Sequence, residues 1–130
     1  MKAVPCLALA ALGVAVVVTA GAADRWSGAT KLTVVMVDNR FEPDHLTFQH
    51  GKAYELVLEN RGKDMHEFTA PGFLKAATIR DKRALSSTGD IVVQSGNTAR
   101  VFLIAPPKGH YDLTCADHDW DGMVGSIAVN

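Results

Sequence analysis

Short runs of β-branched and aromatic residues recur from residue 31 to the end of the chain, and turn-forming residues separate them. Runs of this kind are typical of β-strands, whereas glycine, proline, asparagine and aspartate between them are typical of turns. The predicted strands cover residues 31–37, 46–48, 54–59, 66–69, 91–93, 100–104, 111–115 and 124–129. Seven or eight short strands in this arrangement favour an all-β sandwich.

The first 23 residues differ from the rest of the chain. Lys2 gives a positive start, residues 4–18 are mostly apolar, and the small residues of 20–23 are suited to cleavage, so residues 1–23 are predicted to be a secretory signal peptide. The alternative is an uncleaved membrane anchor, because the apolar run is close to the length that spans a bilayer. Cleavage would leave residues 24–130 as one periplasmic domain with no membrane span.

Charge and cysteine content narrow the possible functions. Lys2 is the only charged residue of the leader, so 12 basic and 14 acidic residues remain, a net charge of −2. This balance gives no support to nucleic-acid binding, which requires a strongly basic surface. Cys6 lies in the leader and Cys115 is the only other cysteine, so no internal disulfide is expected. A lone thiol is readily oxidised outside the cytoplasm, which favours a metal role over a buried, inert cysteine.

Three metal-binding residue types follow one another near the end of the chain. Cys115, His118 and Met123 form the pattern C-x2-H-x4-M between two predicted strands. A thiolate, an imidazole and a thioether together suit copper, and one more imidazole would complete a trigonal His2Cys site with a weak axial methionine. His66 is the best candidate for that fourth ligand. His45, His50 and His110 have no such companions and are predicted to lie on the surface.

Four sequence features carry a family resemblance. They are the Asn60-x-Gly62 loop before His66, the Gly109-x-Tyr111 approach to Cys115, the C-x2-H-x4-M pattern, and Gly122-Met123-x-Gly125. Over roughly residues 31–130 the chain resembles small bacterial cupredoxins of the plastocyanin, pseudoazurin and amicyanin type. The resemblance implies a Greek-key β-sandwich or barrel that binds one copper ion between loops at one end.

The resemblance also implies a function. The chain would shuttle single electrons, as a monomer, between redox partner proteins such as a c-type cytochrome or a periplasmic oxidoreductase. Cys115 would supply the strong thiolate bond, His66 and His118 the neutral nitrogen ligands, and Met123 the weak axial ligand that tunes the potential. No ligand position is left open for a substrate, so we expect no catalysis. A hydrolase that uses Cys115 and His118 would also lack a third catalytic member.

Three residues near the predicted ligands depart from the family pattern. Glu67 follows His66 where relatives commonly have asparagine, Asp117 precedes His118 where many have proline, and Met65 adds a soft atom beside His66. Such features also resemble cupredoxins that handle copper. The alternative function is therefore a copper-binding protein for copper resistance, storage or delivery.

The acidic run Asp117-x-Asp119-x-Asp121 imitates the start of an EF-hand calcium loop. Its twelfth position is Ala128, where a bidentate glutamate is needed, and a strand is predicted where a helix should follow, so we expect no calcium site. The three aspartates would instead form an acidic rim that attracts a basic partner or keeps the loop solvated. Trp120 would either be an exposed contact for that partner or pack over the loop.

Residues 73–90 have no strand pattern. Leu74, Ala77 and Leu85 would line a helical turn or two, with the basic side chains of this segment pointing outward. We favour a solvated surface for these side chains, and the alternative is a docking patch for an acidic partner. The basic residues are Lys75, Arg80, Lys82 and Arg83.

Overall fold

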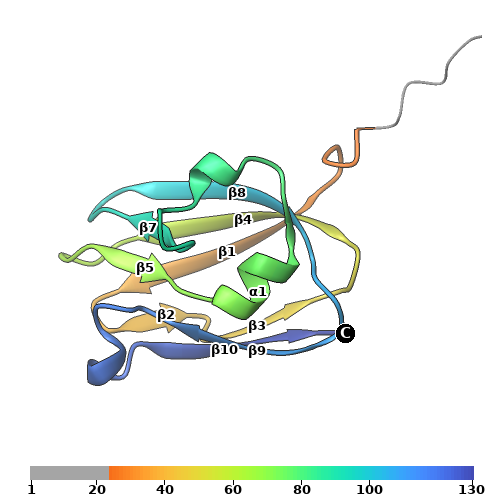
Figure 1. Cartoon of the computed structure of the whole chain (residues 1–130). Coiled ribbons are helices and arrows are strands. Elements are labelled where there is room, and N and C mark those ends of the chain that lie inside the picture. Colours follow the sequence, from red (N-terminus) through yellow and green to blue (C-terminus); the bar gives the residue numbers. More distant parts are fainter. Residues whose placement is uncertain (1–23) are drawn as a thin grey trace, which may run out of the picture.

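Two β-sheet layers pack face to face in the computed structural model, which describes residues 24–130 (Figure 1). The first sheet has the strand order β2-β1-β4-β8-β6. The second layer contains a sheet in the order β3-β10-β9 and the pair β5-β7. The predicted signal peptide, residues 1–23, lies outside the described residues.

The strand bounds follow the chain. They are β1 Thr30–Val37, β2 Arg40–Glu42, β3 His45–Phe48, β4 Ala53–Asn60, β5 His66–Phe68, β6 Thr78–Ile79, β7 Ile91–Val93, β8 Thr98–Ile104, β9 Gly109–Thr114 and β10 Val124–Val129. A helix α1, Pro71–Ala76, and two 3-10 turns, η1 Lys82–Ala84 and η2 Asp119–Asp121, interrupt them.

Strand directions are mixed, as in a Greek-key sandwich. β1 runs parallel to β4 and β3 runs parallel to β10, whereas the other pairs are antiparallel. Parallel neighbours cannot be joined by a tight hairpin, so the chain crosses between the layers to make them. The predicted cupredoxin-like sandwich is therefore confirmed.

Alternating apolar residues from both layers form the core. Val34 and Met36 of β1 and Leu56 and Leu58 of β4 are fully buried. Phe48 of β3 lies at the centre, where its ring centroid is 4.8 Å from Tyr54 and 4.9 Å from Phe73 of α1. Aromatic contacts therefore connect β3, β4 and α1 across the space between the layers.

All eight predicted strands are present, but two short ones were missed. β2 folds back onto β1 through a turn at Asn39, whose φ of 70° is in the left-handed region that asparagine tolerates. β6 has two residues at the edge of its sheet. Strands this short contain too few residues to show an alternating pattern.

The segment between β5 and β7 does contain the predicted helical turns. α1 begins at Pro71. Proline suits the first helical turn, because an N–H at this position would have no partner within the helix. Leu74 of α1 is buried, while Ala77 and Leu85 pack against the core at its edge. Within residues 24–130, no helix is long and apolar enough to cross a membrane.

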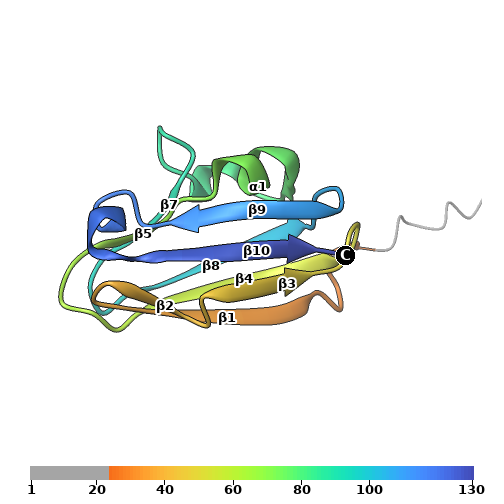
Figure 2. The ribbon, with the colours of Figure 1, turned by 90° about the horizontal axis from the view of Figure 1, so that it is seen from below.

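Three connections lie at the same end of the sandwich. These are the β1–β2 turn, the β4–β5 loop and the β9–β10 loop that contains η2, and both views place them opposite the C-terminus (Figures 1 and 2). Segments far apart in sequence therefore meet at this end.

Removing the central ring tests the packing. We expect Phe48→Ala to lower the free energy of unfolding by about 3–5 kcal/mol, because the substitution leaves a cavity between the layers. Urea denaturation of the metal-free protein measures the change. Trp120→Ala is the control, since 79% of Trp120 is exposed, and a change within about 0.5 kcal/mol is expected for it. Equal losses in the two variants would contradict this description of the core.

Candidate metal centre

Three of the four predicted ligands converge at the end of the sandwich where the loops meet. His66 begins β5, Cys115 directly follows β9, and His118 lies in the β9–β10 loop. The Cys115 Sγ atom is 3.5 Å from Nδ1 of His118 and 3.9 Å from Nδ1 of His66. The candidate ligand atoms of these three residues all lie within 4.8 Å of one another. A thiol and two imidazoles thus face a common point.

The β9–β10 loop fixes the positions of three predicted ligands through its own backbone. The N–H of His118 donates to the carbonyl of Cys115 at 3.0 Å, and the N–H of Met123 donates to the carbonyl of His118 at 3.1 Å. The N–H of Cys115 donates to the carbonyl of Met123 at 3.0 Å. Met123 is fully buried and directly precedes β10. The spacing C-x2-H-x4-M therefore corresponds to one loop that these backbone hydrogen bonds close.

Gly122 allows the loop to return to the sheet. Its φ of 84° ends η2 in the left-handed conformation, which glycine adopts without steric cost. After this reversal β10 pairs with β9, with Val124 opposite Thr114. A strand follows the acidic run, where an EF-hand would need a helix, which agrees with the rejection of a calcium loop.

Pairing between β5 and the end of β9 brings His66 to the loop. Thr69 and Thr114 exchange two backbone hydrogen bonds of 2.9 Å each, in an antiparallel bridge. Because the bridge is antiparallel, the residues before Thr69 lie beside those after Thr114. The N–H of Glu67 accordingly donates to Cys115 Sγ at 3.3 Å.

The thiol is enclosed by protein. Cys115 and His66 have no exposed surface. Burial raises the pKa of the Cys115 thiol, and the N–H of Glu67 partly opposes this by donating to the sulfur. A bound cation reverses that balance, because a coordinating thiol loses its proton.

The donor set fits copper. Among the described residues, one sulfur and two imidazole nitrogens form the cluster, no carboxylate belongs to it, and a buried methionine lies in the same loop. Hard cations such as calcium and magnesium prefer oxygen ligands, whereas thiolate, imidazole and thioether suit copper.

Two residues that support the site were not assigned roles from the sequence. Asn60 was noted only as part of the Asn-x-Gly motif. Its buried amide donates to the carbonyls of Asp64 and Val93, each at 2.8 Å, and accepts from the N–H of Gly62 at 2.9 Å. It therefore holds the β4–β5 loop closed just before His66.

Asp38 was not predicted to be part of the site. Its Oδ1 atom lies 3.1 Å from Nε2 of His66, 28 residues further along the chain. The N–H of Lys63 donates to both carboxylate oxygens, and this contact, with one from the N–H of Asp64, holds the pKa of Asp38 below its usual value. No local motif marks Asp38, because the fold alone creates the contact.

His118 is the predicted ligand that reaches the surface. Its side chain is 18% exposed, and its Nε2 atom is 3.8 Å from a carboxylate oxygen of Asp64. Asp117, Asp119 and Asp121 of the same loop are exposed, as expected for the acidic rim. Burial raises the pKa of Glu67, and the charges of Asp117 and Asp90 add to this effect.

Trp120 was predicted either to be exposed or to pack over the loop, and it is exposed. Its side chain extends into solvent, although its indole N–H donates to the carbonyl of Asp117 at 2.9 Å. The ring is therefore oriented without being covered. His45, His50 and His110 are exposed, as expected.

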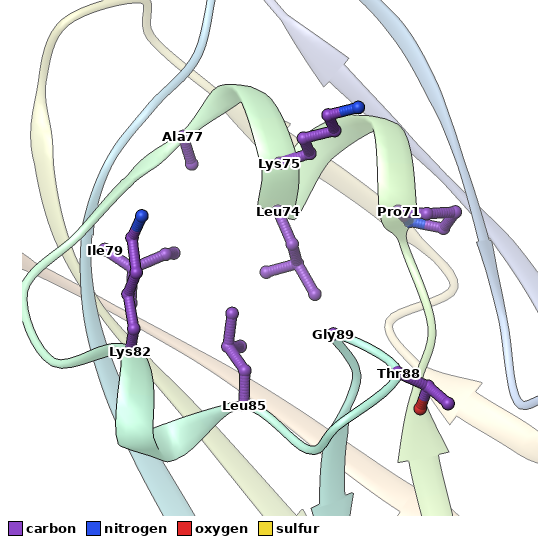
Figure 3. Close-up of a pocket in the computed structure, with 9 residues that line it drawn as sticks. All are labelled: Pro71, Leu74, Lys75, Ala77, Ile79, Lys82, Leu85, Thr88 and Gly89. Carbon is purple, nitrogen blue, oxygen red and sulfur yellow. The ribbon is translucent and has the colours of Figure 1, made fainter.

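A separate pocket of about 340 Å³ lies between α1, η1 and the turn before β7 (Figure 3). Leu74 and Leu85 point into it and Lys82 stands at its edge. None of the four predicted ligands lines this pocket.

The basic residues of the segment 73–90 are exposed, as expected for a solvated surface. Among them, the Arg83 guanidinium lowers the pKa of Asp81 to about 2.

Comparison with known proteins agrees with the fold and the site. The cupredoxin-like domain family matches residues 8–129, so the chain belongs to this family. Together with the family, the cluster of two histidines and a cysteine beside a buried methionine defines a type 1 copper site. The resemblance to cupredoxins is confirmed.

Two solved structures show the same fold. The dithionite-reduced auracyanin from the photosynthetic bacterium Roseiflexus castenholzii matches with a TM-score of 0.58 at 16% identity, over 78% of this chain and 98% of that one. Auracyanin B matches with a TM-score of 0.59 at 18% identity, over 78% and 89%. No curated protein sequence gives a significant match.

Substitution of the loop-closing amide provides a test of the support around His66. We expect Asn60→Ala to lower the free energy of unfolding by about 2–4 kcal/mol, because two carbonyls and one N–H lose their partner in a buried position. Chemical denaturation of the metal-free protein gives the value. Asn97→Ala removes an exposed amide and should change it by less than about 0.5 kcal/mol. The assigned role of Asn60 is wrong if both variants are equally stable.

Proposed function

We propose that this protein is an exported electron carrier in which His66, Cys115, His118 and Met123 bind one copper ion. The observation that carries the proposal is the unequal burial of these side chains. His66, Cys115 and Met123 have no exposed surface, whereas His118 reaches solvent at one edge. A bound ion would be enclosed by protein on three sides, which favours retaining copper over exchanging it.

Copper, when bound, supplies a one-electron couple between Cu(I) and Cu(II). The protein contributes ligands that its backbone hydrogen bonds hold in place. Cys115, His118 and Met123 belong to one hydrogen-bonded loop, and the Thr69–Thr114 bridge holds the strand of His66 against it. His118 is the one proposed ligand with exposed surface, so its edge is the proposed exit for the electron. The proposal includes no catalytic role.

We further propose that residues 1–23 are removed as a signal peptide and that residues 24–130 act as a monomer in the periplasm. The charge, apolar run and small residues of 1–23 support export. Burial of the lone thiol Cys115 suits an oxidising compartment, because an exposed thiol would be modified there.

The proposed partners are redox proteins with a basic docking surface, such as a c-type cytochrome or a periplasmic oxidoreductase. Asp64 and the acidic rim lie around the exposed edge of His118. Opposite charges across such an interface accelerate encounter more than they strengthen the complex. The exposed ring of Trp120, in the same loop, offers an apolar contact for a partner. The rim consists of Asp117, Asp119 and Asp121.

Copper resistance, storage or delivery is the alternative function. The half-buried Met65 beside His66 is the observation that favours it, since a second thioether could receive copper in transit. Rapid transfer of copper to a chelator or an acceptor, together with slow electron self-exchange, would support this alternative.

A visible and EPR spectrum after addition of Cu(II) tests the site. We expect an intense thiolate-to-copper band that disappears on addition of ascorbate, because Cys115 is placed to bind the ion directly. Cys115→Ser is the control and should lack the band. A pale spectrum that Cys115→Ser leaves unchanged would disprove the blue-copper assignment.

Salt dependence tests the partner surface. Steering by a whole charged surface contributes about 10–10³-fold to association rates, so we expect Asp119→Asn to slow electron transfer to a lysine-rich cytochrome by about two- to fivefold at low salt. The difference should vanish near 1 M salt, where screening is nearly complete. Stopped-flow absorbance gives the rates.

Asp24→Asn changes the net charge equally but lies in the segment before β1, and β1 begins at the end of the sandwich opposite the loops. It should leave the rate unchanged. Equal slowing in both variants would show that net charge, and not the acidic rim, controls the encounter.

A further inference from the structure

The imidazole of His66 has two different neighbours on its two nitrogens. Nδ1 faces Cys115 Sγ at 3.9 Å, inside the ligand cluster, and Nε2 faces Oδ1 of Asp38 at 3.1 Å. The ring is fully buried, so solvent does not contact it. One nitrogen is therefore available to a metal, while the other meets a carboxylate.

The carboxylate of Asp38 is held in place by the loop that precedes His66. The N–H of Lys63 is 2.9 Å from Oδ1 and 3.1 Å from Oδ2, and the N–H of Asp64 is 3.3 Å from Oδ1. These contacts fix the orientation of the carboxylate toward the ring. They also connect the β1–β2 turn to the β4–β5 loop.

Gly62 leaves the space that this contact occupies. A Cβ atom at this position would lie 2.8 Å from Nε2 of His66 and would also collide with Oδ1 of Asp38. The backbone cannot easily move aside, because its N–H donates to Asn60 at 2.9 Å and its carbonyl accepts from Ser95 Oγ at 2.7 Å. Any larger residue would therefore separate the carboxylate from the imidazole.

We propose that Asp38 is a positioning residue that holds the His66 proton on Nε2, directs the Nδ1 lone pair toward copper, and lowers the reduction potential of the site. The inference rests on the proposed copper function. A ligand histidine is oriented by the hydrogen bond that its other nitrogen makes. A fixed negative charge on the opposite side of the His66 ring from the ion also stabilises Cu(II) more than Cu(I), because Cu(II) carries the larger charge.

The chain contains a matched control pair. Asp44 accepts from Nδ1 of His45 at 2.6 Å, and both side chains are largely exposed. The residue types are the same, but no other metal-binding side chain faces His45 in the described part of the chain. Exposed pairs of this kind contribute little, so changes at Asp44 should have no effect on the site.

The first test needs no metal. Long-range ¹⁵N NMR of the purified, metal-free protein reports which nitrogen of His66 carries the proton. We expect the Nε2–H form in the wild type and in Asp44→Ala, and a mixture of the two tautomers in Asp38→Ala. An Nδ1–H form in the wild type, or no change in Asp38→Ala, would overturn the proposal.

The second test separates charge from hydrogen bonding. Asp38→Asn keeps an oxygen that can accept from Nε2 but removes the charge. We expect its Cu(II) affinity to fall about 10–100-fold, the range for loss of such outer partners, and its Cu(I) affinity to fall less. Each tenfold fall in the Cu(II) affinity relative to the Cu(I) affinity raises the potential by 59 mV.

Gly62→Ala provides an independent variant that retains the charge. It should raise the potential in the same direction, because the new methyl group separates Asp38 from His66. Gly72→Ala is its control, since a Cβ there would make only an ordinary contact of 3.5 Å with Tyr111.

The results distinguish the failure of this inference from the failure of the proposed function. A blue wild-type protein in which Asp38→Asn has the same potential as Asp44→Asn would overturn the role of Asp38 alone. A wild-type protein without the blue spectrum would overturn the copper function, while the tautomer measurement on the metal-free protein would still decide which proton Asp38 holds.

Discussion

The antiparallel pairing of the β5 segment with the end of β9 is the constraint on which the site depends. The Thr69–Thr114 bridge sets the register that places the N–H of Glu67 on Cys115 Sγ and His66 beside it. The thiol and both imidazoles thereby face a common point. A metal ion that binds there binds only the folded state, so the sandwich is expected to be more stable with copper than without it.

The sequence was informative where contacts are local. Cys115, His118 and Met123 lie in one loop, and their spacing reflects the three backbone hydrogen bonds that close it. His66 could be selected because the Asn60-x-Gly62 loop before it had a recognisable form. Strand β2 could not be predicted, because a three-residue strand has no clear periodicity. The role of Asp38 could not be predicted either, because its contact with His66 spans 28 residues.

The glycine and asparagine of the β4–β5 loop show why such motifs carry more information than single ligands. Asn60 closes the loop with its buried amide, and Gly62 supplies the space in which a carboxylate can approach the back of the His66 ring. Neither residue would touch the ion. Both determine where a ligand points, which is the property that fixed geometry and small reorganisation require.

Two groups of negatively charged residues act on this site, and their effects on reduction potential and on partner association are separable. Asp38 lies directly behind a buried ligand, so its influence on the Cu(I)/Cu(II) equilibrium should persist at high salt. The acidic rim lies in solvent, so its influence on partner encounter should be screened within a Debye length of about 8–10 Å. Reduction potential and association rate should therefore respond to different aspartates, and only the association rate should depend strongly on ionic strength.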